Sequence, residues 1–230
     1  MDSVYVNKDG ENPELRYSLR SQVNVPCDLV WVIGGAPVWL NTERVHYQSR
    51  PQEGSAYMST RAHIKAACQT KDVSDPFTLW NDDFYAMRPT TLGVPMHRGP
   101  LSDLTERFAK IKTPWAKGLH EAAAILKAQG DENPVSYDTH HPLIVHKKEM
   151  LVALRLVEKA KVDAIHLRTI YGNLAALDGV QVEDSKLLRR TDPFPDGPWL
   201  SSGDGTYRST IEPVLRYTFP DPCIYEKGPS

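Results

Sequence analysis

The chain has 230 residues, of which 40% are hydrophobic and 24% charged, which is enough to build one sizeable core. Its net charge of −2 argues against a broad basic surface, so we expect no nucleic acid partner. No apolar run approaches the roughly 18 residues of a membrane span, and residues 1–10 contain no apolar signal region. The three cysteines are widely spaced, which suits a reducing compartment. We therefore expect a cytoplasmic protein without a membrane span.

The first 90 residues alternate between strand-like and helix-like segments. Strands are expected at Ser3–Asn7, Asp28–Ile33, Arg44–Gln48 and from Thr78 into Asn81, and helices from Pro13 and over Tyr57–Gln69. The run DLVWVI is continuously apolar, as in a strand that is buried on both faces. This alternation predicts an α/β fold with a mainly parallel sheet and helices on both faces.

After residue 100 the pattern becomes mostly helical. Helices are expected at Ser102–Lys112, with Ser102 as N-cap, and at Trp115–Gln129, Lys147–Lys161 and Asp163–Leu177. Ser136–Val145 is expected to be extended and Ser201–Thr206 to be a loop. We expect one catalytic domain over residues 1–230. It would comprise an α/β core at 1–90, a helical half at 100–180 and a Pro-rich tail at 190–230 that packs on the core.

Two adjacent carboxylates, Asp82 and Asp83, follow the strand that enters Asn81. In open parallel sheets, ligands bind at the carboxyl ends of the strands. The pair could hold a divalent cation that neutralises a diphosphate. Alternatively, the two residues form a turn whose side chains cap a following helix.

The chain also offers histidines and arginines for phosphate chemistry. His140 and His141 are neighbours in an extended segment and should point to opposite faces, so one of them could be a base in a cleft. Alternatively, both lie on the surface. Arg16 and Arg20 share a helix face, and Arg168 lies in a later helix. Arginine suits bidentate phosphate contact, but each could equally form a surface salt bridge.

Several short motifs occur in an order that resembles one known family. They are ELRYSLRS at 14–21, APVWLN at 36–41, WNDDF at 80–84, THHP at 139–142 and HLR at 166–168, preceded by DSVY at 2–5, with SSGD at 201–204 as a further block. Together they resemble the Stealth family of sugar-1-phosphate transferases, which includes capsule polymerases and N-acetylglucosamine-1-phosphotransferase. The match departs from the family in the short stretch between Asp2 and Glu14 and in Met58–Arg61.

The resemblance implies a GT-A-like nucleotide-sugar fold and transfer of a sugar-1-phosphate from a nucleotide diphosphosugar to a hydroxyl of a glycan or protein acceptor. It also implies roles for individual residues. Asp2, Arg16, Arg20, Asn81 and Asp82 would bind the nucleotide sugar, Asp82 and Asp83 would hold Mg²⁺ or Mn²⁺, and His140, Asp83 and Arg168 would be catalytic.

Two other functions fit the same motifs. An ordinary glycosyltransferase would move only the sugar and leave the diphosphate on the nucleotide. A non-catalytic glycan-binding module would keep the fold without the activity. The presence of Asp83, His140 and Arg168 together disfavours the second of these.

Overall fold

The computed structural model describes residues 1–52, 54–162, 166–203 and 205–228. Its centre is a five-stranded sheet in the order β3-β2-β1-β4-β7. The strands are β1 (Ser3–Asn7), β2 (Val30–Gly34), β3 (His46–Ser49), β4 (Phe77–Asn81) and β7 (Leu143–Val145). The first four are parallel, and β7 joins β4 antiparallel. The prediction of an α/β fold with a mainly parallel sheet is therefore confirmed.

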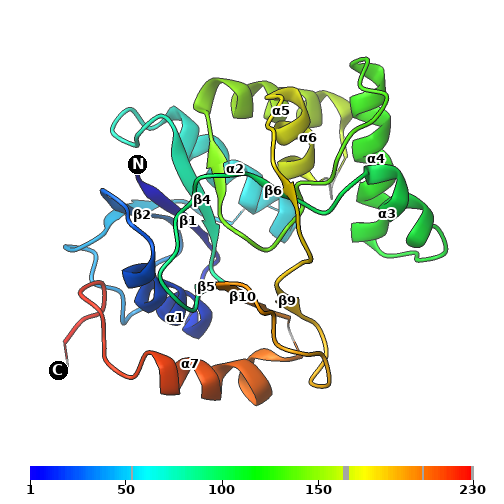
Figure 1. Cartoon of the computed structure of the whole chain (residues 1–230). Helices are drawn as coiled ribbons and strands as arrows, with labels where there is room; N and C mark the ends of the chain where they lie inside the picture. The colour runs from blue at the N-terminus through cyan, green and yellow to red at the C-terminus, as the bar shows by residue number, and fades with distance from the viewer. Residues whose placement is uncertain (53, 163–165, 204, 229–230) are drawn as a thin grey trace.

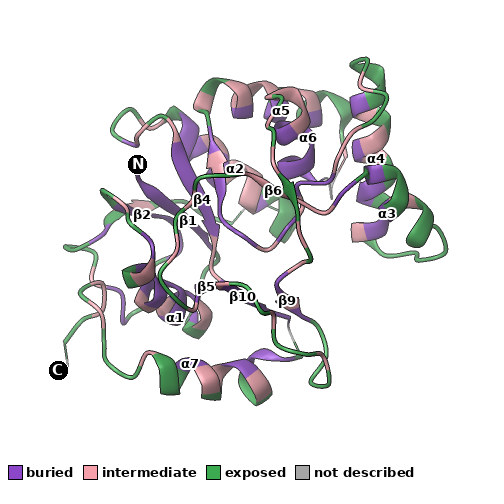
Figure 2. Ribbon diagram, viewed as in Figure 1, coloured by how far each residue is buried: buried purple, intermediate pink, exposed green. Residues whose placement is uncertain are grey.

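Helices cover both faces of this sheet. Successive side chains of a strand point to opposite faces, and here both faces carry apolar side chains that must be buried. On one face, Val4 and Val6 of β1 share an apolar core with residues of the helices α2 and α5. On the other face, Tyr5 packs with residues of α1. The helices of the described residues are α1 (Pro13–Ser21), α2 (Ala56–Gln69), α3 (Leu101–Arg107), α4 (Pro114–Ala128), α5 (Lys147–Ala160), α6 (Leu167–Leu174) and α7 (Glu212–Thr218). Figure 2 shows the buried strands between these outer elements.

Among the described residues, two small sheets and two short helical turns complete the fold. They are the sheet β5-β10-β9, the pair β6-β8, a 3₁₀ turn at Gln22–Asn24 and a π-helical turn at Tyr207–Ile211. The strands are β5 (Phe84–Ala86), β6 (Met96–His97), β8 (Val180–Gln181), β9 (Lys186–Leu187) and β10 (Trp199–Ser202). In Figure 1, β5, β10 and β9 lie below the central sheet, between it and α7.

Several predicted boundaries are wrong. The helix expected at Ser102–Lys112 spans Leu101–Arg107, with Pro100 rather than Ser102 at the N-cap position. Only Leu143–Val145 of the expected extended segment is a strand, so His140 and His141 precede it. Ser201 and Ser202 belong to β10, not to a loop, because they pair with β5 and β9.

Parts of three predicted segments lie outside the described residues. Residues 163–165 belong to the helix that is expected at 163–177. Residue 204 belongs both to the loop expected at 201–206 and to the motif SSGD at 201–204. None of the helices among the described residues is long and apolar enough to cross a membrane.

Candidate functional site

The carboxyl ends of the two central strands form the edge at which the site lies. β1 ends at Asn7 and β4 at Asn81, and the two strands are hydrogen-bonded neighbours. Asp82 and Asp83 form the turn through which the chain leaves β4 and enters β5. The two carboxylates therefore lie between the large sheet and the small one.

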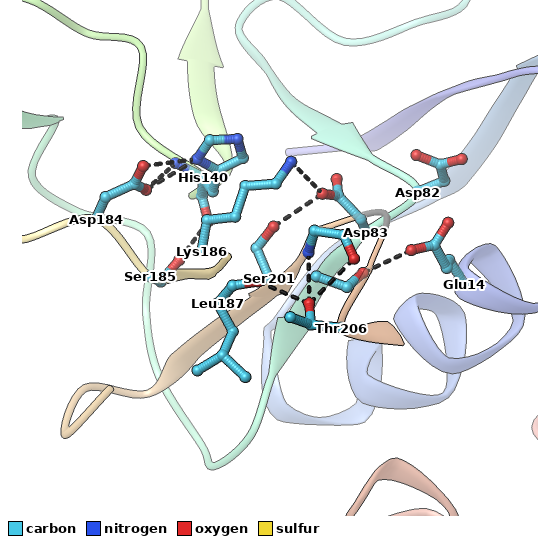
Figure 3. A network of polar contacts seen from close by, with 12 residues as sticks. Glu14, Asp82, Asp83, His140, Asp184, Ser185, Lys186, Leu187, Ser201 and Thr206 are labelled. Carbon is cyan, nitrogen blue, oxygen red and sulfur yellow. Dashed lines mark hydrogen bonds and ion pairs between the residues drawn. The ribbon is translucent and has the colours of Figure 1, made fainter. Parts of the chain in front are cut away.

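The carboxylate of Asp83 is buried and has two partners from the C-terminal part of the chain. Its Oδ2 accepts a hydrogen bond of 2.8 Å from the Ser201 hydroxyl and lies 3.3 Å from the Lys186 ammonium. Ser201 belongs to β10 and Lys186 to β9, so the small sheet supplies both partners (Figure 3). A hydrogen bond and an ion pair thus tie Asp83 to the small sheet.

Asp82 turns to a different set of partners. Its Oδ2 accepts from the Asn12 side chain at 2.5 Å and lies 3.5 Å from the Lys8 ammonium. Asn12 is also the N-cap of α1, so the start of that helix is tied to the strand end. Burial raises the pKa of the Asp82 carboxyl, and the charge of Asp83 raises it further. Lys8 counteracts both effects.

His140 is held by a carboxylate from a distant part of the chain. Its Nδ1 lies 2.9 Å from both oxygens of Asp184, and its backbone N–H donates to Asp184 Oδ1 at 3.0 Å (Figure 3). Burial acts to raise the pKa of Asp184, but the hydrogen bond and charge of His140 outweigh it and lower that pKa to about 2. An ionised Asp184 places the proton of a neutral His140 on Nδ1 and leaves Nε2 as an acceptor.

Arg168 is a buried cation with an incomplete set of partners. Its side chain lies over the ring of Phe84, and one terminal N–H donates to the backbone oxygen of His141. Its Nε is buried and has no hydrogen-bond partner among the described residues. Burial lowers the pKa of Arg168 to about 10, although nearby carboxylates, Asp138 first among them, act to raise it. The group therefore remains charged at neutral pH.

A second histidine–aspartate pair lies beside Arg168. His166 Nδ1 is 2.6 Å from Asp138 Oδ2, and its Nε2 is 2.9 Å from the backbone oxygen of Trp115. Burial alone would lower the pKa of His166, but the charge and hydrogen bond of Asp138 raise it overall. Because both ring nitrogens of His166 already have partners, this pair holds the wall of the site and is poorly placed to exchange protons.

These groups meet in one cavity of about 290 Å³, which we call the His140 cavity. The polar residues that line it include Asn81, Asp138, His140, His166, Arg168 and Lys186. A neighbouring cavity of about 320 Å³ is lined by Asp82 and Lys8 and shares Asn81 and Thr60 with the first. The structure thus brings His140, Arg168 and Asn81 together, with Asp83 joined to them through Lys186.

The carboxylates do not fit a preformed metal site. Asp82 and Asp83 face separate partners, and each already has a lysine ammonium within 3.5 Å. Among the described residues, no group of three or more His, Cys, Asp and Glu side chains is arranged to hold a metal ion. The donor set that Mg²⁺ or Mn²⁺ prefers is six oxygen ligands, and two lysines compete with it here.

Three other residues expected to bind the nucleotide sugar lie away from this edge. Asp2 is at the opposite end of β1, where its Oδ2 accepts from Trp31 Nε1 at 3.0 Å. Arg20 donates two hydrogen bonds to the carboxylate of Glu226, at 2.6 and 2.9 Å. Arg16 lies 3.4 Å from the same carboxylate. The structure does not bring these three residues to the His140 cavity.

Sequence reasoning missed four residues that the structure places at the site. They are Lys8, Asp138, Asp184 and Lys186. Lys8 begins the sequence KDG, which is typical only of a turn, and Asp184 and Lys186 lie in a stretch without helical or strand periodicity. Asp138 directly precedes the motif THHP, which is the one available signal. The other three could be found only from tertiary contacts.

No known family profile matches the chain, and no curated protein matches it as a relative. Among solved structures, the chain is similar to the galactosyltransferase LgtC in complex with donor and acceptor sugar analogues. The two share 13% sequence identity over 76% of this chain and 70% of that chain, with a TM-score of 0.44. The resemblance to the Stealth family stays a prediction from the motifs.

Proposed function

We propose that the chain is a transferase that moves a sugar-1-phosphate from a nucleotide diphosphosugar to a hydroxyl of a glycan or protein acceptor. The observation that carries this proposal is the buried cation of Arg168, which lines the His140 cavity. Its Nε lacks a hydrogen-bond partner among the described residues. A buried, unsatisfied guanidinium is costly unless an anion completes it, and phosphate matches its planar donors.

The reaction requires one group that accepts a proton. The hydroxyl oxygen of the acceptor molecule bonds to the phosphorus that carries the sugar. The bond from that phosphorus to the oxygen between the two phosphates breaks. The electron pair leaves with a nucleoside monophosphate. His140 Nε2 takes the hydroxyl proton, because Asp184 holds the other ring nitrogen as a donor. Asp184 then stabilises the imidazolium that forms.

Positive charge must lie next to the transferred phosphoryl group, whose charge spreads over its equatorial oxygens in the transition state. Arg168 and Lys186 both line the His140 cavity and can supply it. The Asp83 carboxylate fixes the position of the Lys186 ammonium. The Ser201 hydroxyl donates to Asp83 and holds that carboxylate in place. We derive no step through a metal ion, since the carboxylates do not form a site for one.

The products test the proposal. Purified protein is incubated with a panel of nucleotide sugars and glycan acceptors, with and without Mg²⁺, and the released nucleotide is identified by chromatography. A nucleoside monophosphate and a phosphodiester-linked product support sugar-phosphate transfer. A nucleoside diphosphate shows transfer of the sugar alone. Donor binding without turnover by any donor shows a non-catalytic binding module, and the proposal is then wrong.

A control variant separates this activity from contaminants. His140→Ala should bind the donor, as measured by calorimetry, and should release no nucleotide above background. If His140→Ala releases as much nucleotide as the unmodified protein, the activity does not belong to this site.

A further inference from the structure

A separate cavity of about 330 Å³ lies next to the first turn of α1, and we call it the Tyr207 cavity. The residues that line it include Glu14, Arg190, Tyr207, Arg208 and Ser209. None of these five residues lines the His140 cavity or its neighbour. The Tyr207 cavity is therefore separate from the candidate active site.

The first observation is the hydroxyl of Tyr207. The residue is 6% exposed, and its oxygen is buried without a hydrogen-bond partner among the described residues. Burial raises the pKa of this phenol, so it remains a donor at neutral pH. A buried hydroxyl that has no partner costs free energy, unless a ligand supplies one.

The second observation is the local backbone. Tyr207, Arg208 and Ser209 lie in a π-helical turn that immediately precedes α7. Such turns are rare and frequently occur at functional sites. Here the turn supplies three of the polar side chains that line one cavity.

The third observation is charge. Two arginines, Arg190 and Arg208, line the cavity, and neither has an ion-pair partner in the part of the chain that the structure describes. Among the described residues that line the cavity, one is a carboxylate, Glu14, which accepts a hydrogen bond of 2.6 Å from Ser202 and lies 3.6 Å from the Lys8 ammonium. Burial raises the pKa of the Glu14 carboxyl.

We propose that the Tyr207 cavity is a second anion site, which binds a phosphate monoester through Arg190, Arg208 and the Tyr207 hydroxyl. Two guanidinium groups and two hydroxyls provide donors in several directions, which suits a tetrahedral phosphate better than a planar carboxylate. The site lies close to the candidate active site, because Lys8 bridges Glu14 and Asp82. If the proposed function holds, the phosphate is one that the acceptor carries.

Backbone amide NMR shifts test this site by its location. The labelled protein is titrated at constant ionic strength with inorganic phosphate, glucose 6-phosphate and glucose. We expect the two phosphates, and not glucose, to shift the amides of Gly205, Tyr207 and Ser209. Tighter binding of glucose 6-phosphate indicates a phosphate attached to a sugar, and equal affinity indicates free phosphate.

Matched variants identify the groups responsible. Arg208→Gln should weaken phosphate binding at these amides by about 10- to 100-fold, because it removes charge-assisted hydrogen bonds. Tyr207→Phe should weaken it by about 2- to 10-fold. Arg189→Gln is the control, since Arg189 is an exposed neighbour that does not line the cavity. Circular dichroism confirms that each variant is folded.

The result that overturns the proposal is independent of the enzyme assay. If millimolar phosphate leaves the amides of residues 205–209 unshifted, or if Arg208→Gln and Arg189→Gln bind equally well, the cavity is not a phosphate site. Phosphate in the His140 cavity would instead shift amides near His140 and Arg168. Failure of sugar-phosphate transfer would leave the shifts at the Tyr207 cavity unaffected.

Discussion

His140 Nδ1 lies 2.9 Å from both carboxylate oxygens of Asp184, although 44 residues separate the two in sequence. The same carboxylate also accepts the backbone N–H of His140. Asp184 therefore fixes both the ring and the main chain of the proposed base. A carboxylate that orients an imidazole in this way selects the tautomer that can accept a proton from substrate.

We predict that Asp184→Asn lowers kcat by about 100- to 10,000-fold and leaves the KM for the donor nearly unchanged, because an amide can stabilise the wrong tautomer of His140. Steady-state kinetics measure both constants. Glu183→Gln is the matched control, since Glu183 is an exposed neighbour. Equal kcat values for the two variants would show that Asp184 has no part in positioning His140.

The two neighbouring histidines should respond differently to removal. His140 lines the cavity, whereas His141 is 4% exposed and packs against Trp199. His140→Ala should therefore abolish transfer with donor binding intact, because a general base contributes mainly to the transition state. His141→Ala should retain most of the activity at temperatures where it stays folded. If only His141→Ala is inactive, the base has been assigned to the wrong histidine.

Replacement of Arg168 should affect binding and turnover together. A guanidinium that contacts a phosphate acts in the ground state and more strongly in the transition state. Arg168→Lys keeps the charge but loses the planar donors, and we expect kcat/KM to fall by about 10- to 1000-fold, with KM rising as kcat falls. Unchanged KM in Arg168→Lys would mean that this side chain does not contact the bound donor.

Arg20 should act on stability, not on the donor. Its side chain and that of Glu226 are 10% and 6% exposed, and they form a bidentate pair that ties α1 to the C-terminal segment. Arg20→Met removes the bidentate pair and leaves Glu226 with Arg16, whose Nε lies 3.4 Å away, so we expect the free energy of unfolding to fall by about 1–3 kcal/mol. Urea denaturation measures this loss. Donor affinity should stay unchanged, whereas a role at the nucleotide would weaken it.

Most of the central sheet could be predicted because each of these strands has a recognisable pattern within its own residues. The runs SVYVN, VWVIG and FTLWN are mostly apolar and rich in β-branched or aromatic residues, and Pro13 with Asn12 marks the start of α1. The antiparallel strand β7 was missed as a member of the sheet because its three residues carry too little pattern to be placed. The short strand β10 pairs with β5, which lies far away in sequence, and β9 in turn pairs with β10.

Some residues of the candidate site also carry a local signal in the sequence. His140 and Arg168 belong to short motifs, and Asn81 ends a clear strand. Asp184 and Lys186 act through contacts across 44 and 103 residues, which no local pattern encodes. Arg16 and Arg20 show the opposite case, because a motif placed them at the nucleotide while the structure turns them toward Glu226.

The stability of the protein should decrease as the pH falls below 7, because of His141. Burial lowers the pKa of this histidine from 6.5 to about 4. The unfolded chain therefore binds a proton as the pH falls through 6.5, while the folded protein cannot do so until about pH 4. From this group alone, the free energy of unfolding should fall by about 2 kcal/mol between pH 7 and pH 5.

His141→Leu removes the effect, so urea denaturation at both pH values should show a smaller loss of stability in the variant. The raised pKa of His166 acts in the opposite direction, but it is common to both proteins and cancels in the comparison. Equal losses in the two proteins would show that His141 is protonated as readily in the folded state as in the unfolded one.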